Sequence, residues 1–94
     1  MTVTLLVPSV LRVDSGGVGR LDVELGAQSS LGDLFDAVAQ THPRLERRIR
    51  DEQRRIRRYV NVYVDGEESR SLDGGATRLR DGAEVHVIPS VAGG

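Results

Sequence analysis

The residues best suited to chemistry are the two glycines at the end of the chain, Gly93 and Gly94. A terminal carboxyl group has a pKa of about 3.3–3.7, so at neutral pH it is ionised and a poor electrophile. It reacts after activation, most simply as an acyl-adenylate made from ATP, and attack by sulfur then gives a thiocarboxylate. Glycine suits such a site, because it has no Cβ to hinder attack and its backbone can follow a narrow tunnel.

The segment before the glycines is expected to hold them away from the folded domain. Strand-like residues end near Ile88, and Pro89 stiffens the exit from a sheet. We therefore expect a domain over residues 1–89 and a flexible tail over 90–94, which reaches about 17 Å when fully extended. The tail residues that would enter a partner's active site are Val91, Ala92, Gly93 and Gly94, with no cleavage needed to expose the glycines. The alternative is a frayed end without a role.

The other reactive side chains do not form a recognisable site. His42 and His86 are the only histidines, and the chain has no cysteine. A metal centre needs three or four ligands, and nucleophilic catalysis needs a nucleophile beside an oriented base. We expect His42 at a helix end and His86 on an exposed sheet face. We therefore predict no metal and no bound cofactor, with any ATP used by the activating partner.

Glycine clusters in this chain are predicted to be turns. The segment "GGVG" at 16–19 lacks both the lysine and the spacing of a phosphate-binding loop. The same interpretation applies to "DGG" at 73–75, because glycines supply the positive φ angles that turns need.

An arginine-rich run gives the sequence an uneven charge. Residues 44–58 hold eight arginines and three acidic residues, a local balance of +5, so the rest of the chain sums to −6 within a net charge of −1. A solvated helix face with pairs such as Glu46–Arg50 is the favoured interpretation. Nucleic-acid binding is disfavoured, because Tyr59 is the only nearby ring available for stacking. Docking to an acidic partner stays open.

Composition places the chain among small globular proteins. Its 94 residues suffice for one domain, and no apolar run approaches the roughly 18 residues that span a bilayer. The opening "MTVTLLVPSVLRVD" alternates like a strand and lacks the basic leader of a signal peptide. We expect a cytoplasmic monomer with no membrane partner. All thirteen basic residues are arginines, so the chain cannot be linked to itself through lysine.

The first half of the chain predicts two strands and a helix. Apolar residues alternate over "VTLLVP" (3–8) and "RLDVEL" (20–25), which predicts a hairpin with a long loop. Ser30 and Asp33 have the spacing of a capping box. Apolar residues then recur with helical spacing, at Leu31, Leu34, Phe35 and Val38. This helix is expected to end near Gln40 or Thr41, because Pro43 follows.

The second half predicts a short helix and three strands. The helix is expected near 44–50, followed by an exposed loop. Val60, Val62 and Val64 alternate with polar residues ahead of Asp65–Gly66, a pair that favours a type I′ hairpin turn. A return strand is expected over 67–70 and a last strand over 83–89.

This order of elements is typical of an α+β fold, with a mixed sheet of four to five strands packed on one main helix. If the first and last strands are adjacent and parallel, the architecture is the β-grasp, or ubiquitin-like, fold.

Several motifs carry a resemblance to a known family. The elements "VNVYVDG", "LRDGAEVHVIP" and the terminal "GG" follow one another as in the ubiquitin-like sulfur carrier proteins of the MoaD/ThiS family. The opening "VTLLVPSVLR" and the ending "PSVAGG" resemble most the carriers of a thiocarboxylate-dependent route to cysteine. The resemblance covers essentially the whole chain. Ala83 stands where the family usually has an acidic residue, a departure that concerns a turn preference.

The resemblance implies a protein co-substrate rather than an enzyme. Gly94 would carry the thiocarboxylate, and Gly93 and Gly94 would enter the active site of an ATP-dependent, E1-like activating enzyme. A sulfur-accepting synthase would be the second partner. Family members dock through one face of the sheet, which here is expected to present Leu6, Asn61, Tyr63, His86 and Ile88.

Three other functions remain open at this stage. The chain could be a ubiquitin-like modifier conjugated through Gly94, the small subunit of an enzyme resembling molybdopterin synthase, or a nucleic-acid-binding module. The final sulfur acceptor also stays open among cysteine, thiamine, a molybdopterin and a thio-metabolite such as a thiosugar.

Overall fold

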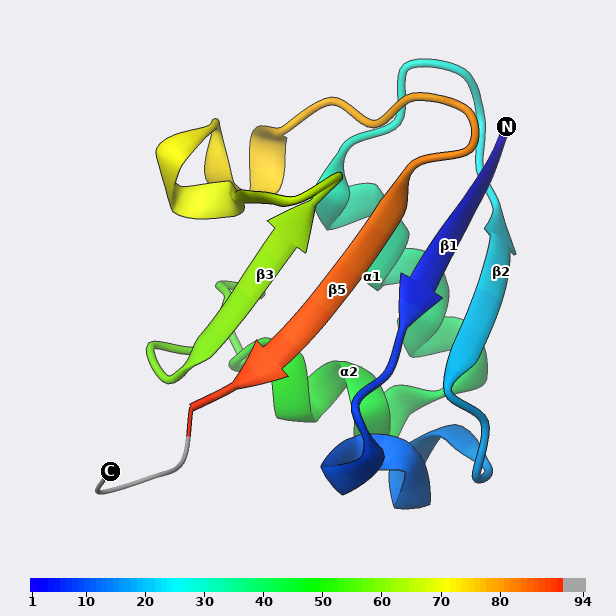
Figure 1. The fold of residues 1–94 in the computed structure, drawn as a ribbon, viewed down its shortest axis with the longest axis vertical. Coiled ribbons are helices and arrows are strands. Elements are labelled where there is room, and N and C mark those ends of the chain that lie inside the picture. Colours follow the sequence, from blue (N-terminus) through cyan, green and yellow to red (C-terminus); the bar gives the residue numbers. More distant parts are fainter. Residues whose placement is uncertain (91–94) are drawn as a thin grey trace.

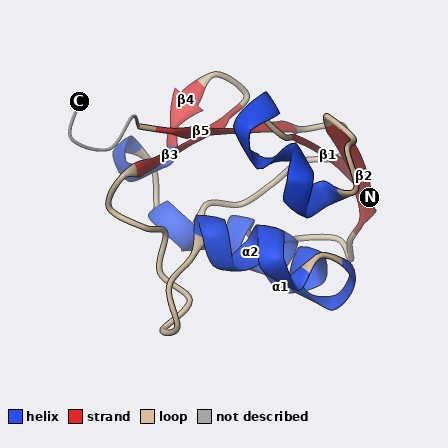
Figure 2. Ribbon diagram, turned by 90° about the horizontal axis from the view of Figure 1, so that it is seen from below, coloured by secondary structure: helices blue, strands red, loops and turns tan. Residues whose placement is uncertain are grey.

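A five-stranded mixed sheet forms one layer of the structure, a computed structural model that describes residues 1–90 (Figure 1). The strands are β1 (Thr2–Leu6), β2 (Arg20–Glu24), β3 (Val60–Val64), β4 (Glu67–Glu68) and β5 (Glu84–Pro89). The helices α1 (Leu31–Thr41) and α2 (Pro43–Ile49) form the second layer and cover one face of the sheet (Figure 2). None of the helices described is long and apolar enough to cross a membrane.

The strand order, β2-β1-β5-β3-β4, places the first and last strands side by side at the centre. β1 and β5 run parallel, with Leu5 beside Val85, whereas the other neighbouring pairs are antiparallel. β5 also pairs with β3 along its length, from Val64 beside Val85 to Val60 beside Pro89.

Helix α1 begins and ends where the sequence predicts. The Ser30 hydroxyl accepts a hydrogen bond from the Asp33 backbone N, while the Asp33 carboxylate accepts one from the Ser30 backbone N, so the capping box is confirmed. The helix ends at Thr41, and Pro43 starts α2, where its missing N–H costs nothing. The four apolar residues with helical spacing are all buried against the sheet.

The core lies between the sheet and the two helices, and the strand alternation places it there. Val3, Leu5 and Val7 of the first strand region are buried, as are the three valines of β3 and the pair Val85 and Val87 of β5. Leu45 and Ile49 add the buried side of α2. Ala83, at the start of the last strand, is also fully buried, so its methyl group fills the core beside the turn at Gly82.

Two segments differ from the sequence prediction. Residues Ser9–Ser15 form a 3₁₀ helix, η1, within the expected loop. The return strand β4 covers only Glu67–Glu68, because the Glu68 carboxylate accepts a hydrogen bond from the Arg70 backbone N and starts a second 3₁₀ turn, Ser69–Ser71. The predicted type I′ turn is consistent with φ angles of 49° at Asp65 and 89° at Gly66.

The arginine-rich run is not a uniformly solvated face. The predicted Glu46–Arg50 pair forms at 2.9 Å, but both residues are buried, with exposed fractions of 7% and 4%. Arg50 also donates to Asp36 at 2.8 Å and lies over the Phe35 ring at 5.6 Å from its centroid. The expectation of a solvated pair is therefore wrong, because helix α1 packs over these side chains and supplies a second carboxylate.

Removing one member of this buried pair is expected to destabilise the fold more than removing both. Arg50→Met should lower the free energy of unfolding by about 3 kcal/mol, because it leaves the Glu46 carboxylate buried without a cation. The double variant Glu46→Leu/Arg50→Met should recover most of that loss. Urea denaturation measures both, and Arg47→Met on the exposed side of the same helix serves as the control. Equal losses in the single and double variants would contradict this prediction.

Candidate functional site

The last strand carries the chain out of the sheet at a well-defined point. β5 stays paired with β3 up to Pro89, and the Ser90 backbone N donates to the Tyr59 carbonyl oxygen at 2.7 Å. The residues to which the sequence assigns chemistry, Val91, Ala92, Gly93 and Gly94, lie outside the described residues. Their roles stay predictions, as does the division into a domain over 1–89 and a tail over 90–94.

Arg70 binds the backbone on either side of Tyr59, the residue beside which the chain leaves the sheet. One guanidinium nitrogen, Nη2, donates to the carbonyl oxygens of Arg57 at 3.1 Å and Val60 at 2.9 Å. The other, Nη1, donates to Asn61 Oδ1 at 3.1 Å and Glu68 Oε1 at 2.9 Å. These contacts fix the start of β3 around Tyr59. Sequence periodicity does not reveal them, because they join a side chain to backbone atoms that only the folded chain brings together.

The five residues predicted to form a docking face do share the outer face of the sheet. Leu6 lies beside His86 across the parallel pair, and Tyr63 lies beside His86 on the other side. Asn61 lies beside Ile88, which is 48% exposed. We call these residues, Leu6, Asn61, Tyr63, His86 and Ile88, the outer strip. The structure confirms their common face, whereas their role in binding stays a prediction.

Charged residues border the outer strip. Arg20, Asp22 and Glu24 project from β2 on the same face, since they pair in register with Leu6, Thr4 and Thr2. On the other side, Glu68 of β4 lies beside Tyr63. An apolar centre with a polar rim is the usual composition of a protein–protein interface.

Thr4 and Asp22 form the polar edge of the same face. The Thr4 side chain is nearly buried, with an exposed fraction of 7%, and its hydroxyl donates to Asp22 Oδ1 at 2.8 Å. Arg20 Nε donates to the same oxygen at 3.1 Å. The Thr4 hydrogen bond first, and then that of Arg20, lower the pKa of Asp22 from its ordinary value of 3.8, because both stabilise the ionised carboxylate.

The histidines and glycine turns are where the sequence predicts them. His42 caps the end of α1, with its Nδ1 2.8 Å from the Thr41 hydroxyl, and His86 is exposed on β5. Gly16 and Gly17 have φ angles of 70° and 86°, as a turn requires. Within residues 1–90, no group of three or more His, Cys, Asp or Glu side chains could hold a metal ion.

Sequence reasoning missed one exposed apolar feature. Val10 and Val13 on η1 are 68% and 80% exposed, whereas Leu11 between them is buried. In Figure 1, η1 lies at the same end of the sheet as the carboxyl end of β5. The sequence signal is weak, because a seven-residue 3₁₀ helix in which only Leu11 and Ser15 are buried has no readable periodicity.

Comparisons with known proteins identify sequences that are similar to this chain. A model of the ThiS family matches residues 13–94. The sulfur carrier protein CysO of Mycobacterium tuberculosis is 31% identical over 96 residues, which cover 100% of both proteins. Small archaeal modifier protein 3 of Haloferax volcanii is 38% identical over 66 residues, covering 70% of this chain and 71% of that protein.

A solved structure extends the likeness to three dimensions. A chain in the crystal structure of the Amycolatopsis orientalis BexX/CysO complex matches with a TM-score of 0.83 and 32% identity, covering 98% of this chain and 99% of that chain. The α+β, β-grasp architecture expected from the sequence is thereby confirmed.

The Thr4–Asp22 hydrogen bond predicts a pH-dependent contribution to stability. Because the pKa of Asp22 is lowered on folding, its contribution is present above the unfolded value of 3.8 and is lost as pH falls through the folded value. Thr4→Val should therefore lower the melting temperature most above about pH 4, and the difference from the wild type should narrow in stronger acid.

Melting temperatures of both proteins between neutral and acidic pH measure this effect. Thr77→Val is the matched control, since Thr77 is also buried but its hydroxyl accepts a hydrogen bond from the Asp73 backbone N and not one involving a carboxylate. If the difference in melting temperature between Thr4→Val and the wild type stays constant over the whole pH range, the Thr4 hydroxyl does not stabilise the ionised Asp22 carboxylate.

Proposed function

This chain belongs to the ThiS family, and we propose on that premise that it is a sulfur carrier, a protein co-substrate whose C-terminal Gly94 is converted to a thiocarboxylate. The observation that carries the proposal is the family match over residues 13–94, which includes Gly93 and Gly94. Support comes from CysO of Mycobacterium tuberculosis, a sulfur carrier that matches the chain from end to end.

The proposed reaction has two steps, both in the active site of an E1-like activating enzyme. The Gly94 carboxylate attacks the α-phosphorus of ATP, which gives an acyl-adenylate and releases pyrophosphate. Hydrosulfide then attacks the acyl carbon and AMP leaves, and loss of a proton gives the thiocarboxylate on Gly94. ATP belongs to the activating enzyme, so we propose that the chain itself binds no cofactor. The carrier contributes an unhindered terminus and a rigid domain that presents it.

The outer strip is the proposed docking surface for the activating enzyme and for a sulfur-accepting synthase. It lies on the strand that leads into the tail, so a partner that holds the tail also meets Ile88 and His86. In the Amycolatopsis orientalis structure, the matching protein is part of a complex with BexX. We place this function in the cytoplasm, where the donated sulfur enters the biosynthesis of cysteine, thiamine, a molybdopterin or a thio-metabolite such as a thiosugar.

A second candidate function is protein modification through Gly94. The observation in its favour is the 38% identity to small archaeal modifier protein 3. Both functions would use the same activated terminus, and the nucleophile decides the product, since sulfur gives a thiocarboxylate and a lysine amine gives an amide bond. Isolation of target peptides that carry the chain's terminus on lysine would support modification. A stable subunit of a molybdopterin-synthase-like enzyme would instead co-purify with its large subunit.

Intact-mass spectrometry tests the carrier function directly. The chain is incubated with the activating enzyme of the same organism, ATP and a sulfide source. We expect a mass gain that corresponds to exchange of one oxygen for sulfur, and no gain when ATP is omitted. An unchanged mass in the complete reaction would rule out the carrier function.

Deleting Gly94 should abolish this mass gain while leaving the melting temperature nearly unchanged, because Gly94 follows the last described residue of the fold by four positions. Gly94→Ala should fold normally and load poorly, since its Cβ crowds the acyl carbon. A large drop in melting temperature on deletion would show that the terminus has a structural role instead.

The outer strip should matter for loading and not for folding. Ile88→Asp places a charge at its most exposed apolar position and should raise the apparent KM for the activating enzyme about tenfold, with little change in melting temperature. Ala76→Asp, which adds the same charge at an exposed position on the 3₁₀ turn Gly74–Ala76, is the control. Identical loading kinetics in the two variants would exclude the strip as the docking surface.

A further inference from the structure

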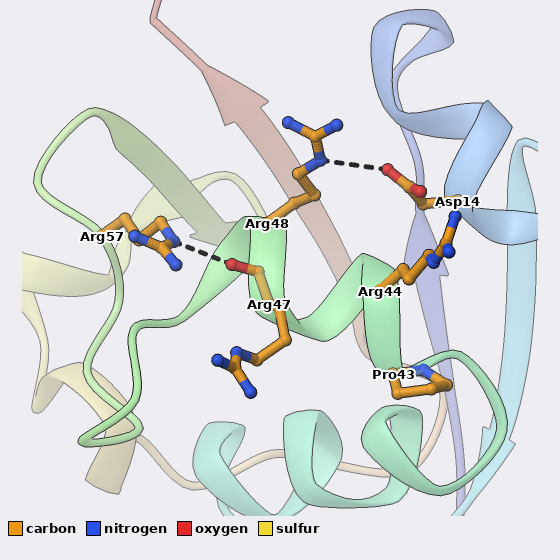
Figure 3. Close-up of a pocket in the computed structure, with 6 residues that line it drawn as sticks. All are labelled: Asp14, Pro43, Arg44, Arg47, Arg48 and Arg57. Atoms are coloured by element: carbon orange, nitrogen blue, oxygen red, sulfur yellow. Dashed lines mark hydrogen bonds and ion pairs between the residues drawn. The ribbon is translucent and has the colours of Figure 1, made fainter.

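Four arginines surround an open cleft beside α2. The cleft has a volume of about 520 Å³ and is lined by Asp14, Pro43, Arg44, Arg47, Arg48 and Arg57. Figure 3 shows Arg44 and Arg48 extending from α2 toward Asp14 on η1, while Arg57 approaches α2 from the segment before β3. We call the four residues Arg44, Arg47, Arg48 and Arg57 the arginine surface.

The arginine surface keeps most of its positive charge. Asp14 is the one acidic residue in the lining, and its carboxylate pairs with Arg48 Nε at 3.2 Å. Glu52 approaches Arg47 only to 3.8 Å, at the outer limit for an ion pair and with both side chains exposed. Within residues 1–90, neither Arg44 nor Arg57 takes part in an ion pair. The Arg44 guanidinium group and the two Nη groups of Arg57, whose Nε donates to the Arg47 carbonyl oxygen, are therefore available to an external anion.

Hydrogen bonds and one short stretch of chain join this surface to the tail exit, which is the point at which Ser90 follows β5 out of the sheet. Ser90 N donates to the Tyr59 carbonyl oxygen at 2.7 Å, and Tyr59 is two residues from Arg57. Arg57 N donates to the Ile49 carbonyl oxygen at 2.9 Å, and its Nε donates to the Arg47 carbonyl oxygen at 2.8 Å. The arginine surface is therefore fixed to the same end of the molecule at which the tail leaves the sheet.

We propose that the arginine surface docks on an acidic protein surface surrounding the pocket of the activating enzyme into which the tail is inserted. This inference rests on the proposed function, because it assigns the contact to the enzyme that receives Gly94. Guanidinium groups bind carboxylates in a planar, two-point arrangement, so glutamate and aspartate side chains of the enzyme are the matching groups.

The charge distribution favours a protein over a nucleic acid. Outside residues 44–58 the chain sums to −6, so a long polyanion would be repelled wherever it extended beyond the arginine surface. Tyr59 is the one exposed ring near it, and Arg58 already lies over that ring at 5.5 Å from its centroid. A bounded positive surface on an acidic molecule instead orients the carrier as it approaches a partner with a bounded negative surface.

The expected effect is on the rate of encounter. Exposed charges act over about 8 Å at physiological ionic strength, and their contribution to binding appears mainly in the association rate. We choose the activating enzyme as the partner because each carrier cycle begins with that encounter.

The test uses Arg44→Gln/Arg47→Gln in the full chain. Within residues 1–90 the Arg44 side chain forms no hydrogen bond or ion pair, and that of Arg47 approaches only Glu52, at 3.8 Å, so the double change disturbs the fold little. Association with the activating enzyme is followed by stopped-flow fluorescence over a series of salt concentrations. At low salt, the association rate should fall about threefold to tenfold, with a nearly unchanged dissociation rate. At high salt, the variant and the wild type should converge.

Arg78→Gln/Arg80→Gln is the matched control. It removes the same charge close to the start of β5, at the end of that strand opposite the tail exit, and should change the association rate less than twofold. Equal rates for Arg44→Gln/Arg47→Gln and the wild type would overturn the proposal. So would an equal loss in the control, because it would show a net-charge effect without a defined surface.

The same reactions are analysed by intact mass, which distinguishes failure of the proposed docking surface from failure of the proposed carrier function. Sulfur loading of the wild type with unaltered association of Arg44→Gln/Arg47→Gln would refute the docking surface alone. A wild type that gains no sulfur would refute the carrier function as well. A homopolymeric RNA serves as a third probe. If Arg44→Gln/Arg47→Gln weakens RNA binding, the control does not, and association with the enzyme is unaltered, then the arginine surface binds a nucleic acid and not an acidic protein.

Discussion

The parallel pairing of β1 with β5 is the constraint on which the rest of the structure depends. Parallel neighbours cannot be joined by a tight turn, so the chain between them must cross over, and α1 and α2 cover the sheet on the way. The shared direction also brings the ends of both strands to one side. Consequently η1, which follows β1, and Ser90, which follows β5, leave the sheet together (Figure 1).

The arginines of residues 44–58 occupy two different environments in this fold, the interior and the surface. Arg50 enters the interior, where Glu46, Asp36 and the Gly32 carbonyl oxygen accept its hydrogen bonds. A guanidinium tolerates burial there because each of its three nitrogens finds an acceptor, one from α2 and two from α1. The neighbours Arg47 and Arg48 have no such acceptors in the interior and stay on the surface. The packing of α2 against α1 therefore decides which arginines remain available to a partner.

Local patterns predict those parts of the fold that depend on neighbouring residues. The spacing of Ser30 and Asp33 predicts the start of α1, and the alternation of Val60, Val62 and Val64 predicts a strand with one buried face. The shared face of the outer strip follows from the same alternation. These features need only the geometry of one helix or strand.

Features that depend on distant contacts could not be predicted in this way. The burial of Arg50 depends on Asp36, which comes from another helix, and the position of Tyr59 depends on Arg70, which follows β4. The 3₁₀ helix η1 is held against α2 partly by the ion pair between Asp14 and Arg48. Each of these requires the tertiary fold before the partner residue can be identified.

The two surfaces at the tail exit have complementary physical properties. The outer strip offers limited apolar area, with Ile88 as its one strongly exposed aliphatic side chain, and small apolar contacts give short-lived complexes. In the proposed docking, the arginine surface would raise the association rate and leave the lifetime of the complex nearly unchanged, since exposed charges act before contact is made. A carrier that must leave one enzyme to reach the next benefits from fast association without slow dissociation. In the proposed function, insertion of Gly93 and Gly94 would add specificity that neither surface provides alone, because a narrow pocket that fits glycine excludes a terminus with larger side chains.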